Sequence, residues 1–164
     1  MAKYAFLGAP DLTDLDLESA VAACVRLKGD VVAQDERESV SGGTPGRRAL
    51  LNYGHTLAHA LEVDGAFDLR HGEAVAIGLV FAARLAARLG RIGADRVERH
   101  RGVVASYGLA TEVPDGRDPD RLVALMGRDK KAVDGLTFIL DGPAGCEVVA
   151  GIAPAIVRQV LPGG

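Results

Sequence analysis

The sequence predicts one mainly helical domain with a small β-hairpin, and three observations support this expectation. The chain has 164 residues, which suits a single domain of ordinary size. Hydrophobic residues make up 48% of the chain but aromatic residues only 4%, so small aliphatic side chains must form most of the core. Ala and Leu favour helices. Capping and turn residues separate the apolar segments, and only two of these segments are β-prone.

The N-terminal part of the chain predicts one helix followed by a loop. Asp14 can cap a helix that runs to about Lys28. The Val31-Val32 pair suits either a short strand or a continuation of that helix. Residues 39–46 have the Gly, Ser and Pro content of a loop. One stripe of the helix would carry Leu17, Val21, Cys24 and Lys28.

Four further helices are expected in the middle of the chain. The first runs from about Arg47 to Val63, and the second from near His71 to about Leu89. The early part of the second helix is apolar on all sides, which indicates a buried helix. A third helix spans roughly Ala94 to Tyr107. Asp118-Pro119 then has the residue types of an N-cap and a first helical position, and predicts a short helix to Met126.

The C-terminal segment predicts the β-hairpin. The segment from Leu136 to Leu140 is β-prone, and the segment from Glu147 to Val149 can pair with it across a turn at residues 142–145. Pro154 then begins a last short helix. The expected fold class is therefore mainly α, with one small hairpin.

Charge and hydropathy argue against several classes of protein. A net charge of -3 provides no electrostatic footprint for nucleic acid. The longest apolar run, Ala74 to Ala83, is too short to span a bilayer, and no signal peptide opens the chain. We therefore expect a cytoplasmic protein that binds neither nucleic acid nor membrane. Cys24 and Cys146 lack a CxxC partner and are expected to be buried free thiols.

Three of the four histidines lie within 17 residues of one another. His55 and His59 are four residues apart and would share one face of a helix. His71 follows across a turn, so imidazoles from two helices can converge on one Zn²⁺ ion. The alternative is that each histidine is an ordinary surface or core residue with a hydrogen bond. The third histidine and the glycine-rich context favour the metal.

Glycines flank two of these histidines. Gly54 precedes His55 and Gly72 follows His71, which suggests that the backbone approaches another group closely at both places. The fourth histidine, His100, stands between two arginines on a helix that we expect to be exposed. We therefore expect the His100 side chain to be solvated.

Basic residues elsewhere in the chain could hold an anionic ligand near this cluster. Arg48 opens a predicted helix, where its positive charge opposes the macrodipole, and an anion at that N-terminus would relieve the conflict. Lys28 can instead extend into solvent from a helix end, and Lys130-Lys131 can be a solvated turn. The candidate anion-binding residues are Lys3, Lys28, Arg48, Lys130 and Lys131.

At these residues the chain resembles 3-dehydroquinate synthases. The segments that carry the resemblance are Asn52-Tyr-Gly-His-Thr-x-x-His59-x-x-Glu62 and His71-Gly-Glu-Ala-Val-Ala-Ile-Gly78. Flanking pieces agree, in order along the chain: Lys3-Tyr4, Lys28-x-x-Val-Val, Asp35-Glu-Arg-Glu38 and Asp129-Lys-Lys131. The resemblance implies the helical C-terminal domain of the dehydroquinate synthase-like fold.

The resemblance also implies an activity. Members of this family are lyases of the shikimate pathway, which leads to chorismate and the aromatic amino acids. They convert 3-deoxy-D-arabino-heptulosonate 7-phosphate into 3-dehydroquinate and phosphate. Their cofactors are NAD and a divalent metal, zinc or cobalt.

The resemblance assigns roles to individual residues. His55 and His71 match metal ligands, and His59 matches a histidine that contacts the substrate. Glu38 lies in the matching acidic motif and would orient neighbouring groups. The catalytic set would be His59, Lys28, Asn52 and Arg48. The groups that hold the carboxylate, hydroxyls and phosphate of the substrate would be Lys3, Lys28, Arg48, Asn52 and one or both of Lys130 and Lys131.

The chain also departs from the family pattern. Family members carry an N-terminal nucleotide-binding half with a Gly-rich turn, and this sequence has no G-x-G-x-x-G turn between a strand and a helix. The third metal ligand of the family is a glutamate three residues before the position of Lys3, immediately upstream of Met1. We expect residues 1–164 to be inactive without that half, to bind metal weakly, and to self-associate as a homodimer.

Two other classes of function stay open. One is a different sugar-phosphate cyclase, of the 2-deoxy-scyllo-inosose or valiolone type, because these enzymes share the metal signature. Metal-dependent alcohol dehydrogenases are a more distant match. The other class is a non-catalytic helical module that keeps the fold and serves as a partner subunit.

Overall fold

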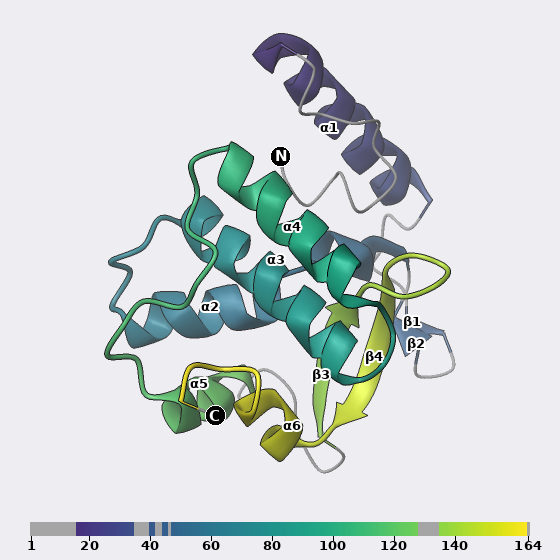
Figure 1. The fold of residues 1–164 in the computed structure, drawn as a ribbon. Helices are drawn as coiled ribbons and strands as arrows, with labels where there is room; N and C mark the ends of the chain where they lie inside the picture. Colours follow the sequence, from purple (N-terminus) through teal and green to yellow (C-terminus); the bar gives the residue numbers. More distant parts are fainter. Residues whose placement is uncertain (1–15, 35–39, 42–43, 46, 128–134, 164) are drawn as a thin grey trace.

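A computed structural model describes residues 16–34, 40–41, 44–45, 47–127 and 135–163 (Figure 1). These residues form a mainly helical domain with a two-stranded hairpin near the C-terminus, as the sequence predicted. The elements are α1 (Leu17–Ala33), β1 (Val40–Ser41), β2 (Thr44–Pro45), the 3-10 helix η2 (Arg47–Asn52), α2 (His55–Asp64), α3 (His71–Arg88), α4 (Ala94–Ser106), α5 (Pro119–Met126), β3 (Leu136–Leu140), β4 (Glu147–Ile152) and α6 (Pro154–Arg158).

Helix α3 is the centre of the core. Its residues from Ala74 to Ala83 are all buried, which confirms the expectation for an all-round apolar helix. Figure 1 shows α3 crossing the middle of the molecule, with α2 and α4 on either side of it. Many of its buried side chains are alanines, so neighbouring elements can approach it closely.

The closest of these approaches joins α3 to the residue before α2. Gly54 has a φ of 81°, a left-handed conformation that favours glycine. A Cβ atom on Gly78 would overlap the carbonyl oxygen of Gly54, so both residues must be small. The prediction of close approach is therefore confirmed for Gly54. At Gly72, no atom of the described residues lies within 4 Å of the position that its Cβ would take, so close approach of the backbone there stays a prediction.

Helix α1 differs from the prediction in its N-cap and its length. Asp16, not Asp14, caps it by accepting from the backbone amide of Ser19 at 3.0 Å, and Asp14 lies outside the described residues. The helix continues to Ala33, so the Val31-Val32 pair is helical. Val21 is 45% exposed, so the stripe that Leu17, Val21, Cys24 and Lys28 share is not the buried side of the helix. The buried side is instead made by Ala20, Ala23, Cys24 and Val31.

The single helix expected from Arg47 to Val63 is two elements. Residues 47–52 form the 3-10 helix η2, and α2 begins at His55 after the left-handed Gly54. This break has a physical reason, because Gly54 turns the backbone toward α3 before the α-helix starts. Arg48 therefore lies in a short 3-10 segment rather than at the start of a long helix.

The remaining elements follow the predicted order. Asp118 caps α5 by accepting from the Asp120 amide at 2.9 Å, with Pro119 as the first helical residue. Strands β3 and β4 pair antiparallel, and β4 runs to Ile152, beyond its predicted end. Phe138 of β3 packs on Phe81 of α3 with ring centroids 6.1 Å apart. The loop predicted at residues 39–46 also contains the short β1–β2 pair.

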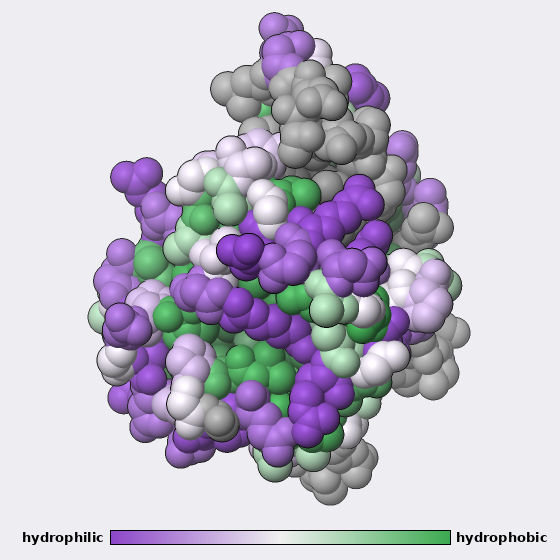
Figure 2. Space-filling view, viewed as in Figure 1, coloured by the Kyte–Doolittle hydropathy of each residue, from purple (hydrophilic) through white to green (hydrophobic). Residues whose placement is uncertain are grey.

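Two surface properties complete the fold. Figure 2 shows hydrophilic side chains running across one face, with apolar residues visible between them. On α4, the exposed side carries charged residues while Val104 points inward and is fully buried. Among the described residues, every helix is too short or too polar to cross a membrane.

Candidate metal and substrate site

The three clustered histidines meet where α2 and α3 begin. His55 is the first residue of α2, His59 follows one turn later, and His71 is the first residue of α3. The ring centroid of His55 lies 5.6 Å from that of His59 and 5.2 Å from that of His71. The rings of His59 and His71 are 6.2 Å apart. His59 and His71 are exposed and His55 is half-buried, so this exposed cluster opens to solvent.

Hydrogen bonds hold two of the three rings in one tautomer. His55 Nδ1 lies 3.1 Å from the carbonyl oxygen of Tyr53, and His71 Nδ1 lies 3.0 Å from Oε1 of Glu62. A carbonyl and a carboxylate only accept, so Nδ1 donates in both rings. In each neutral ring, the lone pair that a metal could use is therefore on Nε2. Metal-binding histidines are typically held by such a second hydrogen bond.

This donor set fits zinc or cobalt in type but is incomplete in number. Imidazole nitrogen suits both metals, and catalytic zinc sites usually have three protein ligands. Within the described ranges, no three His, Cys, Asp or Glu residues are placed to hold a metal ion together. Glu62 already accepts from His71, and Glu73 accepts from the backbone amide of Arg70 at 2.9 Å. A third ligand from elsewhere would complete the site.

The structure brings only some of the predicted substrate-binding residues near these histidines. Asn52 ends η2 and is exposed, three residues before His55, and Arg48 is half-buried in the same 3-10 helix. Lys28 is exposed on α1, which Figure 1 shows beyond α4 and away from α2. Convergence of these groups on one cleft stays a prediction. The positions that lie outside the described residues are Lys3, Glu38, Lys130 and Lys131.

His100 contradicts the expectation of a solvated side chain. It is fully buried, its Nδ1 donates to the carbonyl oxygen of Arg96 at 2.8 Å, and its Nε2 accepts from the hydroxyl of Tyr53 at 2.8 Å. The neighbouring arginines suggested an exposed position. The spacing of Val97, His100 and Val104, three and four residues apart, was the better signal, because it places His100 on the inward stripe of α4.

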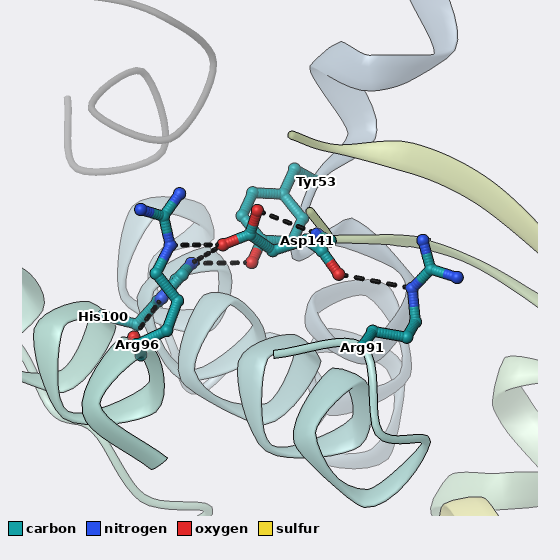
Figure 3. Close-up of polar contacts among 6 residues, drawn as sticks. Tyr53, Arg91, Arg96, His100 and Asp141 are labelled. Carbon is teal, nitrogen blue, oxygen red and sulfur yellow. Dashed lines mark hydrogen bonds and ion pairs between the residues drawn. The ribbon is translucent and has the colours of Figure 1, made fainter. Parts of the chain in front are cut away.

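Asp141 completes this buried cluster of Tyr53, His100 and Asp141, with Arg96 at its edge (Figure 3). Asp141 is fully buried; its Oδ2 accepts from Arg96 Nε at 2.6 Å and its Oδ1 from the Gly142 amide at 3.0 Å. Arg91 Nε donates to its carbonyl oxygen at 3.3 Å. Among the described residues, every buried side-chain nitrogen and oxygen has a hydrogen-bond partner. The buried charge is therefore compensated.

Burial sets the protonation of this cluster. Desolvation lowers the pKa of His100 to about 4, so its ring is neutral at pH 7. Desolvation also raises the pKa of Tyr53 above its ordinary range, which keeps the phenol protonated. Burial, followed by the charge of Asp141, raises the pKa of Cys146 to about 12. Cys146 is partly buried and Cys24 is buried, and both are free thiols.

A family model and several proteins match this chain. Residues 7–132 match the model described as "3-dehydroquinate synthase C-terminal". A candidate aminodehydroquinate synthase of Amycolatopsis mediterranei (strain S699) is 51% identical over 161 residues, which are 98% of this chain and 44% of that protein. A 3-dehydroquinate synthase of Nitrobacter hamburgensis is 47% identical over 156 residues, covering 88% of this chain and 39% of that protein. The chain thus spans less than half the length of these curated relatives.

Solved structures share the fold. A 2-deoxy-scyllo-inosose synthase complexed with carbaglucose-6-phosphate, NAD⁺ and Co²⁺ matches with a TM-score of 0.73 and 25% identity, over 90% of this chain and 41% of that one. A 2-epi-5-epi-valiolone synthase from Streptomyces hygroscopicus, with NAD⁺ and Zn²⁺ bound, matches with a TM-score of 0.68 and 16% identity, over 90% of this chain and 40% of that one. The second likeness shows the fold alone.

Proposed function

Because the chain belongs to the 3-dehydroquinate synthase C-terminal domain family, we propose that it forms the metal- and substrate-binding side of a sugar-phosphate cyclase. The overall reaction is the conversion of 3-deoxy-D-arabino-heptulosonate 7-phosphate into 3-dehydroquinate and phosphate, a step of the shikimate pathway. The observation that carries this proposal is the exposed cluster, in which hydrogen bonds hold His55 and His71 in the same tautomer within 5.2 Å of each other, ring centroid to ring centroid.

The three histidines of the exposed cluster would have two different roles. His55 and His71 would hold the divalent ion through Nε2, while the Tyr53 carbonyl and Glu62 keep the two rings in place. A bound zinc or cobalt ion supplies Lewis acidity to an oxygen of the substrate. His59 is exposed beside both rings, so it would contact the substrate rather than complete the protein core.

The basic residues would hold the acidic ends of the substrate. Arg48 and Asn52 lie on η2 directly before the cluster and would hydrogen-bond a carboxylate and hydroxyls. Lysines near a departing phosphate stabilise the charge that develops on it. We assign this role to Lys28, Lys3 and one or both of Lys130 and Lys131.

The described residues of this chain do not fit a nicotinamide cofactor. The strands among the described residues form antiparallel pairs, and none leads through a Gly-rich turn into a helix as a dinucleotide site requires. Two solved relatives contain NAD⁺. We propose that the hydride chemistry of this family depends on a nucleotide-binding region that these residues do not supply.

One observation favours a second candidate substrate. The match to the Amycolatopsis mediterranei protein covers 98% of this chain at 51% identity, a broader match than the 88% coverage at 47% of the Nitrobacter hamburgensis synthase. The name of that relative refers to an amino-substituted dehydroquinate. The alternative substrate is therefore an amino-substituted analogue of the same heptulosonate phosphate.

Phosphate release tests the proposal. Residues 1–164 would be assayed alone, and again fused to the N-terminal part of the Amycolatopsis mediterranei relative, with NAD⁺, Co²⁺ and each of the two substrates. We expect no turnover by the chain alone and turnover of one substrate by the fusion, which identifies the substrate. The His55→Ala fusion is the matched control and should be inactive. An active His55→Ala fusion, or steady turnover by the chain alone, would contradict the assignment.

A further inference from the structure

We propose that Tyr53, whose hydroxyl is held by His100, is a positioning residue for the metal ligand His55. The inference rests on the proposed function, because it takes His55 as a ligand. Tyr53 connects the buried cluster to the exposed cluster. Its phenol lies in the buried cluster, and its carbonyl oxygen accepts from His55 Nδ1 at the edge of the exposed cluster.

The phenol end of Tyr53 is fixed in one place. The side chain is fully buried, and its hydroxyl donates to Nε2 of His100 at 2.8 Å. The ring of His100 is itself fixed, because its Nδ1 donates to the Arg96 carbonyl oxygen at 2.8 Å. Asp141 accepts from Arg96 on the other side, so α4 and the end of β3 are tied to the same cluster (Figure 3).

The backbone end of Tyr53 is fixed as well. Its amide donates to the carbonyl oxygen of Leu50 at 3.1 Å. The next residue, Gly54, has a positive φ and is packed against α3 at Leu79 and Gly78. The peptide group between Tyr53 and Gly54 therefore has little freedom to rotate. Its oxygen presents one acceptor in one direction to His55.

This arrangement links a buried residue on α4 to the lone pair of a metal ligand. If the phenol of Tyr53 loses its acceptor, Tyr53 keeps its backbone contacts but loses the attachment of its side chain to α4. Its carbonyl oxygen is then held less firmly, and the hydrogen bond to His55 Nδ1 weakens. The His55 ring then populates the tautomer with its proton on Nε2, which has no lone pair there for a metal. Substitution of a group that orients a ligand typically lowers metal affinity by about 10- to 100-fold.

The tautomer of His55 can be measured without any metal. Long-range ¹H–¹⁵N spectra of the 164-residue chain at pH 8 report which ring nitrogen of His55 carries the proton. Three variants form the test: His100→Leu removes the acceptor for Tyr53, His100→Gln offers a side-chain oxygen in its place, and Val104→Ala removes buried volume from the same helix. Tyr53→Phe repeats the first test with loss of a single oxygen, in case His100→Leu does not fold.

We expect His55 to keep its proton on Nδ1 in the parent chain, His100→Gln and Val104→Ala, and to gain a clear Nε2–H population in His100→Leu and Tyr53→Phe. Titration with Co²⁺ should show an affinity about tenfold lower in His100→Leu and Tyr53→Phe only. An unchanged His55 tautomer in folded Tyr53→Phe would overturn the inference, as would an equal change in Val104→Ala. If the fusion to the N-terminal part of the Amycolatopsis mediterranei relative binds no Co²⁺, the proposed function is undermined, while the tautomer spectra of the 164-residue chain still decide the positioning role.

Discussion

Histidines of the exposed cluster (His55 and His71) and of the buried cluster (His100) have the same tautomer but different roles. His55, His71 and His100 each donate from Nδ1, to a backbone carbonyl, a carboxylate and a backbone carbonyl respectively. The difference lies in their surroundings. The ring of His100 is fully buried and its Nε2 accepts from Tyr53, whereas His71 is exposed beside two other imidazoles. The same side chain is thus a structural acceptor in one place and a candidate ligand in the other.

The largest expected effect is a difference in the free energy of unfolding between substitutions in the buried cluster and in the exposed cluster. Tyr53→Ala should lower the free energy of unfolding by about 4 kcal/mol, because it removes a fully buried aromatic ring. His59→Ala should change it by less than about 0.5 kcal/mol, because His59 is exposed. Urea unfolding followed by circular dichroism measures both. Similar losses in the two variants would erase the distinction between the clusters.

The next effect is a pH dependence that belongs to His100. Its pKa is about 4 in the folded chain, below the ordinary value of 6.5. Between these values the unfolded chain binds a proton that the folded chain does not, so the stability is fully present above pH 6.5 and falls as pH approaches 4. The loss should reach about 3 kcal/mol. Unfolding curves of the parent chain and of His100→Gln isolate it, since carboxylates contribute equally to both. Parallel pH profiles would contradict the prediction.

A smaller effect concerns the glycine contact beneath the exposed cluster. Gly78→Ala should cost about 2 kcal/mol, because the added carbon overlaps the Gly54 carbonyl oxygen in a well-packed core. Gly72→Ala is the matched control on the same helix and should be neutral or slightly stabilising, because no atom of the described residues lies within 4 Å of the added Cβ. Thermal unfolding compares the two. Equal destabilisation by both substitutions would mean that the contact is not what limits the residue size at position 78.

The smallest expected effect is on the Co²⁺ affinity of the exposed cluster. Glu62→Gln weakens the acceptor of His71 Nδ1 and should lower Co²⁺ affinity about tenfold, or about 1.4 kcal/mol. Glu98→Gln removes an exposed charge that pairs within α4 and should leave the affinity unchanged. Calorimetric titration of this chain, whose affinity we expect to be low without a third ligand, measures both variants. An affinity that rises in Glu62→Gln would point to another role for this carboxylate.

Spacing and capping chemistry were enough to predict much of the fold. The four-residue spacing of His55 and His59 placed both on α2, and Asp118-Pro119 marked the start of α5. The all-round apolar character of the segment after His71 identified the buried helix α3. These features depend on contacts between residues close in sequence or on composition along one element, so they can be recognised before the elements pack.

The state of His100 and the break before α2 were decided by packing between elements. The arginines beside His100 suggested exposure, but the burial of that ring depends on Tyr53 and Asp141, which lie 47 and 41 residues away in sequence. The left-handed turn at Gly54 likewise follows from contact with Gly78 on α3. Exposure and close approach are properties of the assembled elements, because they depend on which distant side chains fill the neighbouring space. The histidine spacing therefore indicated a candidate site, whereas the hydrogen bonds that orient its rings became visible only once α2, α3 and α4 were packed together.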